Sequence, residues 1–248
     1  MSVGVLLAID CTGSMEVIHK YLADSLAEIV SKFNDEGVPV QFSAIGFRDY
    51  PADPSSAFEI TDFEEDVTQL ERWLSNVKAF GGGSNYGESS MSGVVHGIMS
   101  VNWPDVKRRV VALFTDDGPH IPDYMVDSWS DARDKLSNCE IEQFHLFTIN
   151  RKVERYDELD GHDYVVIRHN LADDDLSDLD LETLEQSVRD FVKVSSSGNF
   201  GSSEIISREE DLESNPFDID DYETESKPVE EPKDFEVEDL DDDFFEMD

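Results

Sequence analysis

The stretch VGVLLAIDCTGSM, residues 3–15, decides the fold, because an unbroken apolar run ends on an acid and two hydroxyl residues. A run of this length without alternation is typical of a strand buried on both faces of a parallel sheet. Asp10, Thr12 and Ser14 then follow at every second position. Polar oxygen atoms directly after a buried strand indicate a binding site at the end of that strand.

Strand and helix patterns alternate through the following residues, up to about residue 195. Strands are predicted at 3–9, 38–47, 57–61, 109–115, 141–149 and 164–168. Apolar residues three or four positions apart predict helices at 15–33, 67–77, 91–99, 123–137 and 181–192. Such alternation predicts a doubly wound, Rossmann-like α/β fold, with a mostly parallel six-stranded sheet and helices on both faces.

The C-terminal part of the chain has a different composition. The 248 residues carry a formal charge of −39, and 199–248 hold 21 acids against three bases. Neither periodicity runs through this segment, and SSSGNFGSS at its start has the composition of a flexible linker. We therefore expect a folded domain at 1–195 and a disordered acidic tail at 196–248.

The charge and the hydropathy exclude several classes of protein. A strongly negative chain repels nucleic-acid phosphates and anionic membranes, so we expect neither as a direct partner. No segment approaches 18 apolar residues, and the first strand begins too early for a signal peptide to precede it. Cys11 and Cys139 suggest no disulfide framework. These features predict a cytoplasmic protein, and the acidic, lysine-poor composition is also common in halophilic proteins.

Two of the predicted strands end on acids, Asp10 and Asp116. If the strand order is 3-2-1-4-5-6, these are the first and fourth strands, and ligands bind where such neighbours send the chain to opposite faces. Two nearby carboxylates repel each other unless a cation or a proton lies between them. The candidate ligands all offer hard oxygen atoms: Asp10, Thr12, Ser14, Ser84 and Asp116. Such ligands favour Mg²⁺, Mn²⁺ or Ca²⁺ over Zn²⁺.

The order of these motifs resembles the metal-ion-dependent adhesion site of von Willebrand factor A (vWA) domains, over residues 1–195. DCTGS matches the pattern D-x-[ST]-x-S, and a loop hydroxyl and a later acid follow in the same order. GFRDYP, AFGGGSNYGES, GVVHGIMSVNWP and LFTDDGPH look like the vWA domains associated with alpha-kinases, although no kinase domain follows here. Their middle loop reads G-G-G-D-x-P-E. Ser84 replaces that acid, with one residue inserted before Glu88, so Asn85 and Glu88 are alternatives as third ligand.

The resemblance implies a non-enzymatic module that uses a divalent cation to grip an acidic residue of a partner protein. In the tail, aromatic residues interleave with acids in NPFDIDDYE and DLDDDFFEMD, a composition suited to a partner's basic groove. A merely solubilising tail is the alternative. The second class of function is a metal-dependent hydrolase or phosphoryl-transfer protein that uses the cation as a Lewis acid. The sequence offers no evident general base for it.

Helix capping is a plainer interpretation of the same residues. Asp10, Thr12 or Ser14 could accept hydrogen bonds from the first turn of the helix predicted at 15–33. Asp116 could likewise cap a helix after the fourth strand. The cation interpretation requires instead that the side chains of Asp10 and Asp116 face each other.

Deletion of 199–248 is expected to leave the melting temperature of the remaining domain almost unchanged, because the segment has no apolar periodicity with which to pack on it. Calorimetry of the full chain and of residues 1–198 measures the difference. A large drop in melting temperature would show that the tail packs on the domain.

Overall fold

The computed structural model describes 2–50, 52–63, 67–82, 87–106, 108–161, 163–171 and 181–197, without the side chains at 17–21, 67, 150, 170–171 and 191–197. By its contacts the chain divides into Met1–Gly201 and Ser202–Asp248. A described helix runs to Ser197, two residues past the predicted end of the domain at 195. The second unit, which holds most of the predicted acidic tail, lies outside the described residues, so the disorder of 198–248 stays a prediction.

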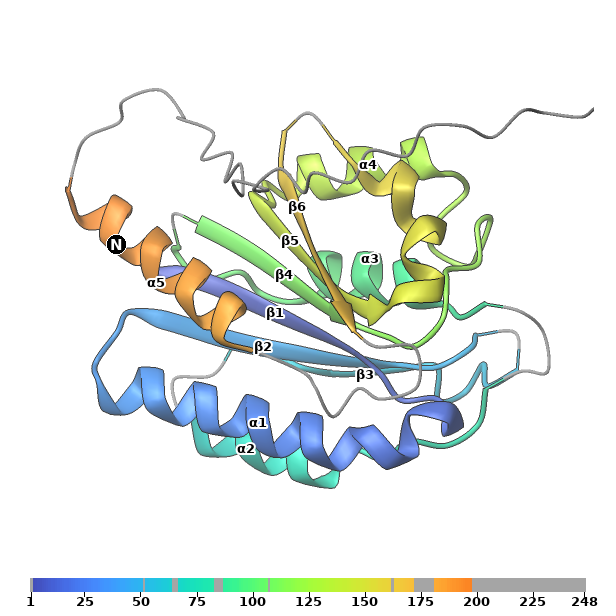
Figure 1. The fold of residues 1–248 in the computed structure, drawn as a ribbon, viewed down its shortest axis with the longest axis horizontal. Helices are drawn as coiled ribbons and strands as arrows, with labels where there is room; N and C mark the ends of the chain where they lie inside the picture. The colour runs from blue at the N-terminus through green and yellow to red at the C-terminus, as the bar shows by residue number, and fades with distance from the viewer. Residues whose placement is uncertain are drawn as a thin grey trace, which may run out of the picture. The chain divides into compact units, whose positions relative to one another are not determined.

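Six strands form one sheet, in the order β3-β2-β1-β4-β5-β6 (Figure 1). They are β1 Val3–Asp10, β2 Val40–Phe47, β3 Phe58–Thr61, β4 Arg108–Phe114, β5 Gln143–Ile149 and β6 Val165–Leu171. All neighbours pair in parallel except β2 and β3, which are antiparallel. The predicted six-stranded, mostly parallel sheet is therefore confirmed, and so is the strand order.

The apolar run at the start of the sequence forms β1, in the interior of the sheet between β2 and β4. All eight of its residues are buried. Val3, Val5, Leu7 and Ile9 belong to one hydrophobic cluster, and Leu6 and Ala8 belong to the cluster on the opposite face. Full burial of a Val, Leu or Ile side chain contributes about 1.5–3 kcal/mol. Because neither face is exposed, the strand needs no polar alternation.

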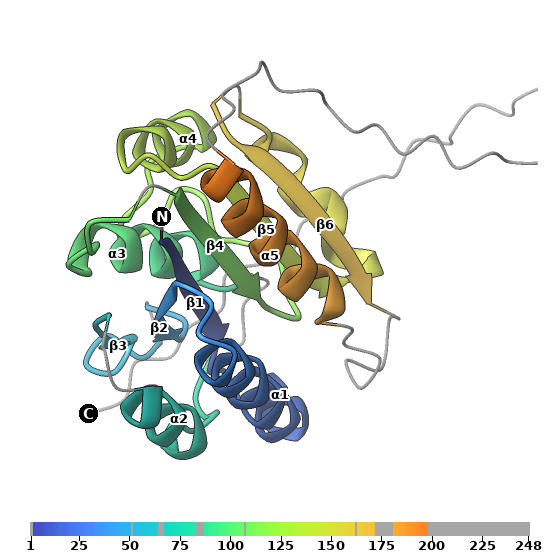
Figure 2. The ribbon, with the colours of Figure 1, turned by 90° about the vertical axis from the view of Figure 1, so that its left-hand side faces the viewer.

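Helices cover both faces of this sheet (Figure 2). α1 (Glu16–Asp35), α2 (Val67–Asn76) and α5 (Glu182–Ser197) lie on one face. α3 (Ser90–Ser100) and α4 (Trp129–Asn138) lie on the other. The chain therefore leaves β1 and β4 toward opposite faces. Among the described residues, no helix is both long and apolar enough to cross a membrane.

One predicted helix, 123–137, begins later than its apolar spacing suggests. α4 starts at Trp129 because Ser128 is its N-cap, and Ser128 Oγ accepts a hydrogen bond from the Asp131 N–H at 3.1 Å. The residues before it form turns, with a short bridge between Asp123 and Val126.

Two 3-10 helices have no counterpart in the prediction. η1 (Gly13–Met15) follows β1 and delays the start of α1, and η2 (Asn150–Leu159) follows β5. The fourth strand also ends sooner than predicted: β4 stops at Phe114, so Asp116 lies two residues beyond it. These changes all fall in the segments that leave the carboxyl ends of strands.

α3 approaches β2 closely because two glycines of the helix face the sheet. A Cβ atom on Gly93 would lie 2.6 Å from Phe47 Cβ, and one on Gly97 would lie 2.8 Å from Leu6 Cδ2. Phe47 is the last residue of β2 and pairs with Asp10 in the register of the sheet. The contact therefore fixes the N-terminus of α3 beside the end of β1.

The substitution Gly93→Ala is expected to lower the free energy of unfolding by about 1–2 kcal/mol. Overlap of the added methyl group with Phe47 costs up to about 3 kcal/mol, and the gain in helix propensity offsets about 1 kcal/mol of that cost. Urea denaturation measures it, with Met99→Ala on the exposed face of the same helix as the control, expected within about 0.5 kcal/mol of wild type. A more stable Gly93→Ala protein would contradict the close packing.

Candidate metal centre

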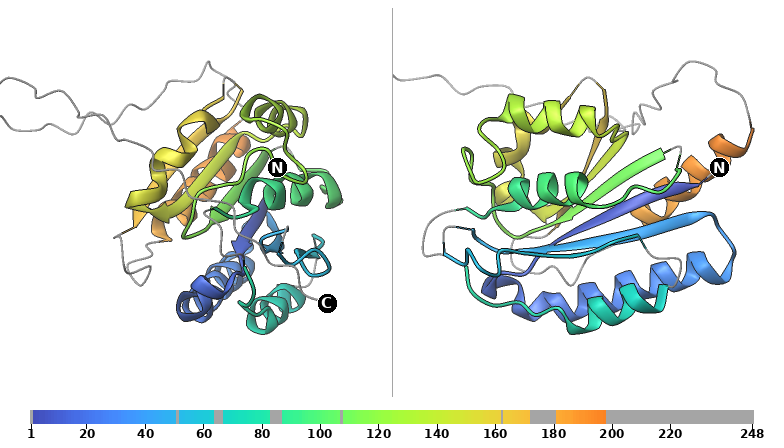
Figure 3. Two further views of the ribbon diagram at one scale, coloured as in Figure 1. Left: turned by 90° about the vertical axis from the view of Figure 1, so that its right-hand side faces the viewer. Right: turned by 180° about the vertical axis from the view of Figure 1, so that it is seen from behind.

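The polar residues predicted at the ends of two strands meet at one edge of the sheet. β1 ends on Asp10, and Asp116 follows β4 by two residues. β1 and β4 pair in parallel up to Ile9 and Phe114, so both acids lie at the carboxyl edge of the sheet. The left-hand view of Figure 3 looks onto this edge. The chain leaves the two strands toward opposite faces here, the arrangement at which open α/β sheets bind ligands.

Two hydroxyl groups connect the carboxyl groups of Asp10 and Asp116. Thr12 Oγ1 donates a hydrogen bond to Asp10 Oδ1 at 2.7 Å. Thr12 Oγ1 and Ser14 Oγ are 3.1 Å apart, and Ser14 Oγ donates to Asp116 Oδ1 at 3.1 Å. Four of the five predicted ligands therefore turn oxygen atoms toward one another in a continuous chain, which we call the oxygen cluster.

Helix capping does not account for these side chains. Thr12 is the N-cap of η1 and Met15 that of α1, and neither side chain makes a capping hydrogen bond in the described structure. The insertion of η1 places Ser14 before α1 begins, and its hydroxyl bonds Asp116 instead of a backbone N–H group. No helix starts near Asp116, since α4 begins at Trp129. Asp10 accepts one backbone N–H, that of Thr12 at 2.9 Å, within a local turn.

The oxygen cluster has fewer hydrogen atoms than close oxygen–oxygen contacts. Three contacts join Asp10 to Asp116, whereas Thr12 and Ser14 supply one hydroxyl hydrogen each. One contact therefore lacks a hydrogen atom unless a carboxyl group is protonated, and a cation among the oxygens would offset the lone-pair repulsion at that contact. The other oxygen of Asp10 is already held, because Thr115 Oγ1 donates to Oδ2 at 2.7 Å.

Burial makes ionisation of the two carboxyl groups unfavourable. Asp10 is fully buried, and burial with the charge of Asp116 raises its pKa to about 7, although hydrogen bonds from Thr12 and Thr115 lower it. Burial also raises the pKa of Asp116, although the hydrogen bond from Ser14 opposes this. A bound cation would favour the ionised form of both groups.

Glu88, one alternative to Ser84, faces the same acids. Its side chain is only 8% exposed, and no described residue donates a hydrogen bond to its buried Oε2. Burial, followed by the charges of neighbouring acids, raises the pKa of Glu88 to about 9. Those acids are Asp10, Asp49, Asp116 and Asp117.

Ser84 and Asn85 lie at 83–86, outside the described residues, so the role of Ser84 as third ligand stays a prediction. The glycines just before them are described. Gly13 N–H donates to Gly81 O at 3.1 Å, and Gly82, at φ +89°, comes so close that a Cβ on it would lie 3.3 Å from Thr12 Cβ. The glycine-rich loop therefore reaches the first motif, as its composition predicts.

Sequence analysis missed three residues that hold this edge together. Thr115 supports Asp10, and Asp53 Oδ2 accepts the Gly82 N–H at 2.7 Å, which anchors the glycine-rich loop. Arg48 is fully buried and donates to Ser56 O at 2.8 Å and to Lys78 O at 2.7 Å. Thr115 carries a readable signal, a hydroxyl directly before the acids of TDD. The contacts of Asp53 and Arg48 join distant segments and leave no local pattern.

Asp117, next to Asp116, belongs to a different network. It forms an ion pair with Lys152. Although burial opposes it, the hydrogen bond from Lys152 lowers the pKa of Asp117 below its ordinary value. Its charge is therefore compensated within the protein, in contrast to that of Asp10.

A cation fits the oxygen cluster by the chemistry of its donors. Across the described ranges, no three or more His, Cys, Asp or Glu side chains are arranged to hold a metal ion by themselves. The cluster instead combines two carboxyl groups with neutral hydroxyls and is short of one hydrogen atom. Hard oxygen donors of this kind suit Mg²⁺, Mn²⁺ or Ca²⁺.

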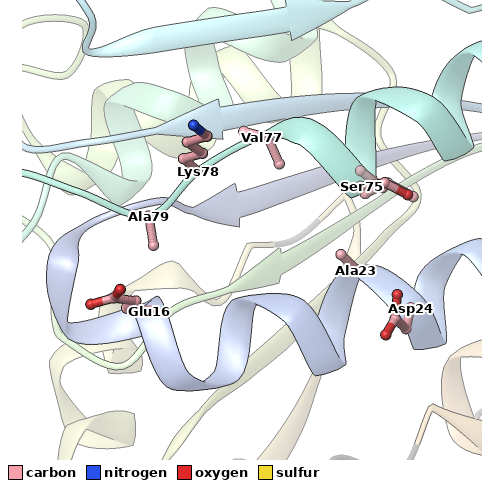
Figure 4. Close-up of a pocket in the computed structure, with 8 residues that line it drawn as sticks. Glu16, Ala23, Asp24, Ser75, Val77, Lys78 and Ala79 are labelled. Carbon is pink, nitrogen blue, oxygen red and sulfur yellow. The ribbon is translucent and has the colours of Figure 1, made fainter.

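A hollow of about 410 Å³ lies elsewhere, between α1 and the segment that ends α2 (Figure 4). Its lining includes acids, one lysine and small apolar residues, namely Glu16, Ala23, Asp24, Leu74, Ser75, Val77, Lys78 and Ala79. It shares no residue with the oxygen cluster, so the two features are separate.

Comparison with known proteins shows the fold alone. No family model and no curated protein matches the chain. The pilus adhesin SpaC from Lactobacillus rhamnosus GG aligns with a TM-score of 0.52 at 13% identity, over 78% of this chain and 30% of the adhesin. Proximal thread matrix protein 1 from the mussel byssus aligns with a TM-score of 0.54 at 16% identity, over 76% of this chain and 47% of that protein. This chain thus spans less than half the length of either protein.

The cation-free protein is expected to lose stability as the pH rises from about 4 to about 7. The unfolded chain ionises Asp10 near the ordinary pKa of 3.8, whereas the folded protein holds this proton until about pH 7. The contribution of Asp10 is therefore complete below pH 3.8 and is lost as the pH passes 7. Urea denaturation in EDTA measures the slope, which Asp10→Asn should flatten. Equal slopes in the two proteins would contradict the assignment.

Proposed function

We propose that residues 1–195 form a vWA domain with a doubly wound sheet, which binds a divalent cation and uses it to grip an acidic residue of a partner protein. The observation that carries this proposal is the oxygen cluster, in which Asp10, Thr12, Ser14 and Asp116 converge where β1 and β4 diverge. The order of these residues in the sequence supports the resemblance to a metal-ion-dependent adhesion site.

The residues of the cluster would divide the work of holding Mg²⁺, Mn²⁺ or Ca²⁺. Asp10 and Asp116 would supply negative charge, and Thr12 and Ser14 would supply neutral oxygens. Ser84 is the remaining predicted ligand. Each hydroxyl can donate its single hydrogen to a carboxylate while its lone pairs face the cation. The cation would thus offset the repulsion between oxygen lone pairs that no hydrogen atom separates.

The cation would supply positive charge and a coordination place for a further carboxylate. With only two carboxylates from the described chain, Mg²⁺ or Mn²⁺ would remain electrophilic enough to take a third from a partner. The rest of the chain is strongly acidic, so the partner should present one acidic residue within an otherwise basic surface. For the tail at 196–248, docking to a second partner's basic groove remains our prediction.

A metal-dependent hydrolase is the second candidate, for one reason. Glu88 is a buried carboxyl group beside the oxygen cluster. It could act as the general base that the sequence alone did not identify. Incubation with p-nitrophenyl phosphate and Mn²⁺ tests this candidate, since turnover that is lost in Asp10→Ala would favour an enzyme over a binding module.

Substitution of Asp116 by Asn is expected to weaken Mg²⁺ and Mn²⁺ binding by at least about tenfold, because one of two charged ligands is lost. Isothermal titration measures the affinity, and circular dichroism confirms that the fold survives. Glu16→Gln is the matched control, since Glu16 is an exposed acid next to the motif and its loss should leave the affinity within about twofold. Equal affinities of wild type and Asp116→Asn would remove the proposed site.

Capture of partners with and without chelator extends the test to the binding function. Partner proteins should be retained only with Mg²⁺ and only by a chain with Asp116 intact. That result would support the proposal that the cation binds a carboxylate of the partner. Capture that is indifferent to both would place the interaction elsewhere on the chain.

A further inference from the structure

Glu88 is fixed beside the segment that carries Asp116. The Glu88 N–H donates to Gly118 O at 2.9 Å, and Glu88 O accepts the His120 N–H at 2.8 Å. These bonds form a short parallel bridge with Pro119. The main chain of Glu88 is therefore tied to the segment after β4.

The side chain of Glu88 and the first motif both approach Gly82. A Cβ atom on Gly82 would lie 3.9 Å from Glu88 Oε1 and 3.3 Å from Thr12 Cβ. Because Gly82 has no side chain, it does not separate the Glu88 carboxyl group from Thr12. Oε2 is buried and accepts no hydrogen bond from any described residue.

A buried carboxyl group in this position is costly to ionise unless something compensates its charge. Two basic side chains are engaged with other acids: Lys152 pairs with Asp117, and Arg48 pairs with Glu59 at 2.9 Å. The neighbours that act on Glu88 are acids, which increase the cost. An amide or apolar side chain would fill the same space without it.

We propose that Glu88 is a selectivity residue of the cation site, which strengthens cation binding and weakens the binding of an incoming carboxylate. This inference rests on the proposed function. Because no three acids of the described chain are arranged to hold a metal directly, Glu88 acts at one remove from the cation. A bound cation favours the ionised form of a nearby carboxyl group. In that form Glu88 attracts the cation and repels a partner's acid, so only a partner with further favourable contacts displaces water from the open coordination position.

The test compares Glu88→Gln with wild type in the full chain. Mn²⁺ affinity is measured from the electron paramagnetic resonance signal of free Mn²⁺, in 150 mM salt. Acetate is then titrated into the Mn²⁺-loaded protein. Its binding displaces water from the ion and is measured as a loss of the Mn²⁺-induced enhancement of water-proton relaxation. Glu28→Gln, which removes an exposed acid on α1, is the control for net charge. Asp10→Ala gives the background of Mn²⁺ bound elsewhere, including the acidic tail.

Two opposite changes are expected in Glu88→Gln. Mn²⁺ should bind about fivefold to tenfold more weakly, and acetate should bind the loaded protein about fivefold more tightly, as the removal of one nearby charge predicts. Changes no larger than those in Glu28→Gln, or changes of both affinities in the same direction, would overturn the inference. Glu88→Met, of similar length, replaces the amide variant if that fails to fold, with the same expectations.

Failure of the cation site itself gives a different result. Wild-type protein would then bind no Mn²⁺ above the Asp10→Ala background, and acetate would have no effect on relaxation. Mn²⁺ binding that depends on Asp10 but is indifferent to Glu88 would leave the proposed function standing and remove only the role of Glu88.

Discussion

Two carboxyl groups lie at the carboxyl edge of neighbouring strands, and the repulsion between their charges makes ionisation of both unfavourable. This repulsion is the constraint on which the site depends. Asp10 is fully buried at the end of β1, and Asp116 follows β4 at the same edge of the sheet. The parallel pairing of β1 with β4 brings both acids to this edge. The protein answers with hydroxyl groups from Thr12 and Ser14, which relieve the repulsion only in part.

Contacts from the surrounding elements keep this arrangement in place. α3 packs on β2 through glycines, which sets the helix N-terminus beside the end of β1. Asp53 holds the glycine-rich loop, and the buried Arg48 connects the loop after β2 to the segment after α2. Each contact joins segments that are distant in the sequence. The edge is therefore held by the whole domain and not by one motif.

Much of this arrangement could be predicted from the sequence, because it follows from periodicity and from strand ends. The unbroken run before Asp10 predicted a central strand, and the recurrence of an acid after 109–115 predicted that Asp10 and Asp116 meet. What escaped prediction depends on non-local geometry. The insertion of η1, the support of Asp10 by Thr115 and the direction of the Glu88 side chain arise from loop paths that no local period encodes. The late start of α4 did have a local signal, the capping residue Ser128.

The way in which Asp10 is held has a consequence for the rate at which a cation could enter. Both of its oxygens are already fixed, one by Thr12 and the other by Thr115, so β1 has nothing to rearrange on binding. The slow step would then be the release of water by the ion itself. Because Mg²⁺ gives up its water reluctantly, a rigid site of this kind would fill more slowly with Mg²⁺ than with Mn²⁺ or Ca²⁺, whatever their relative affinities.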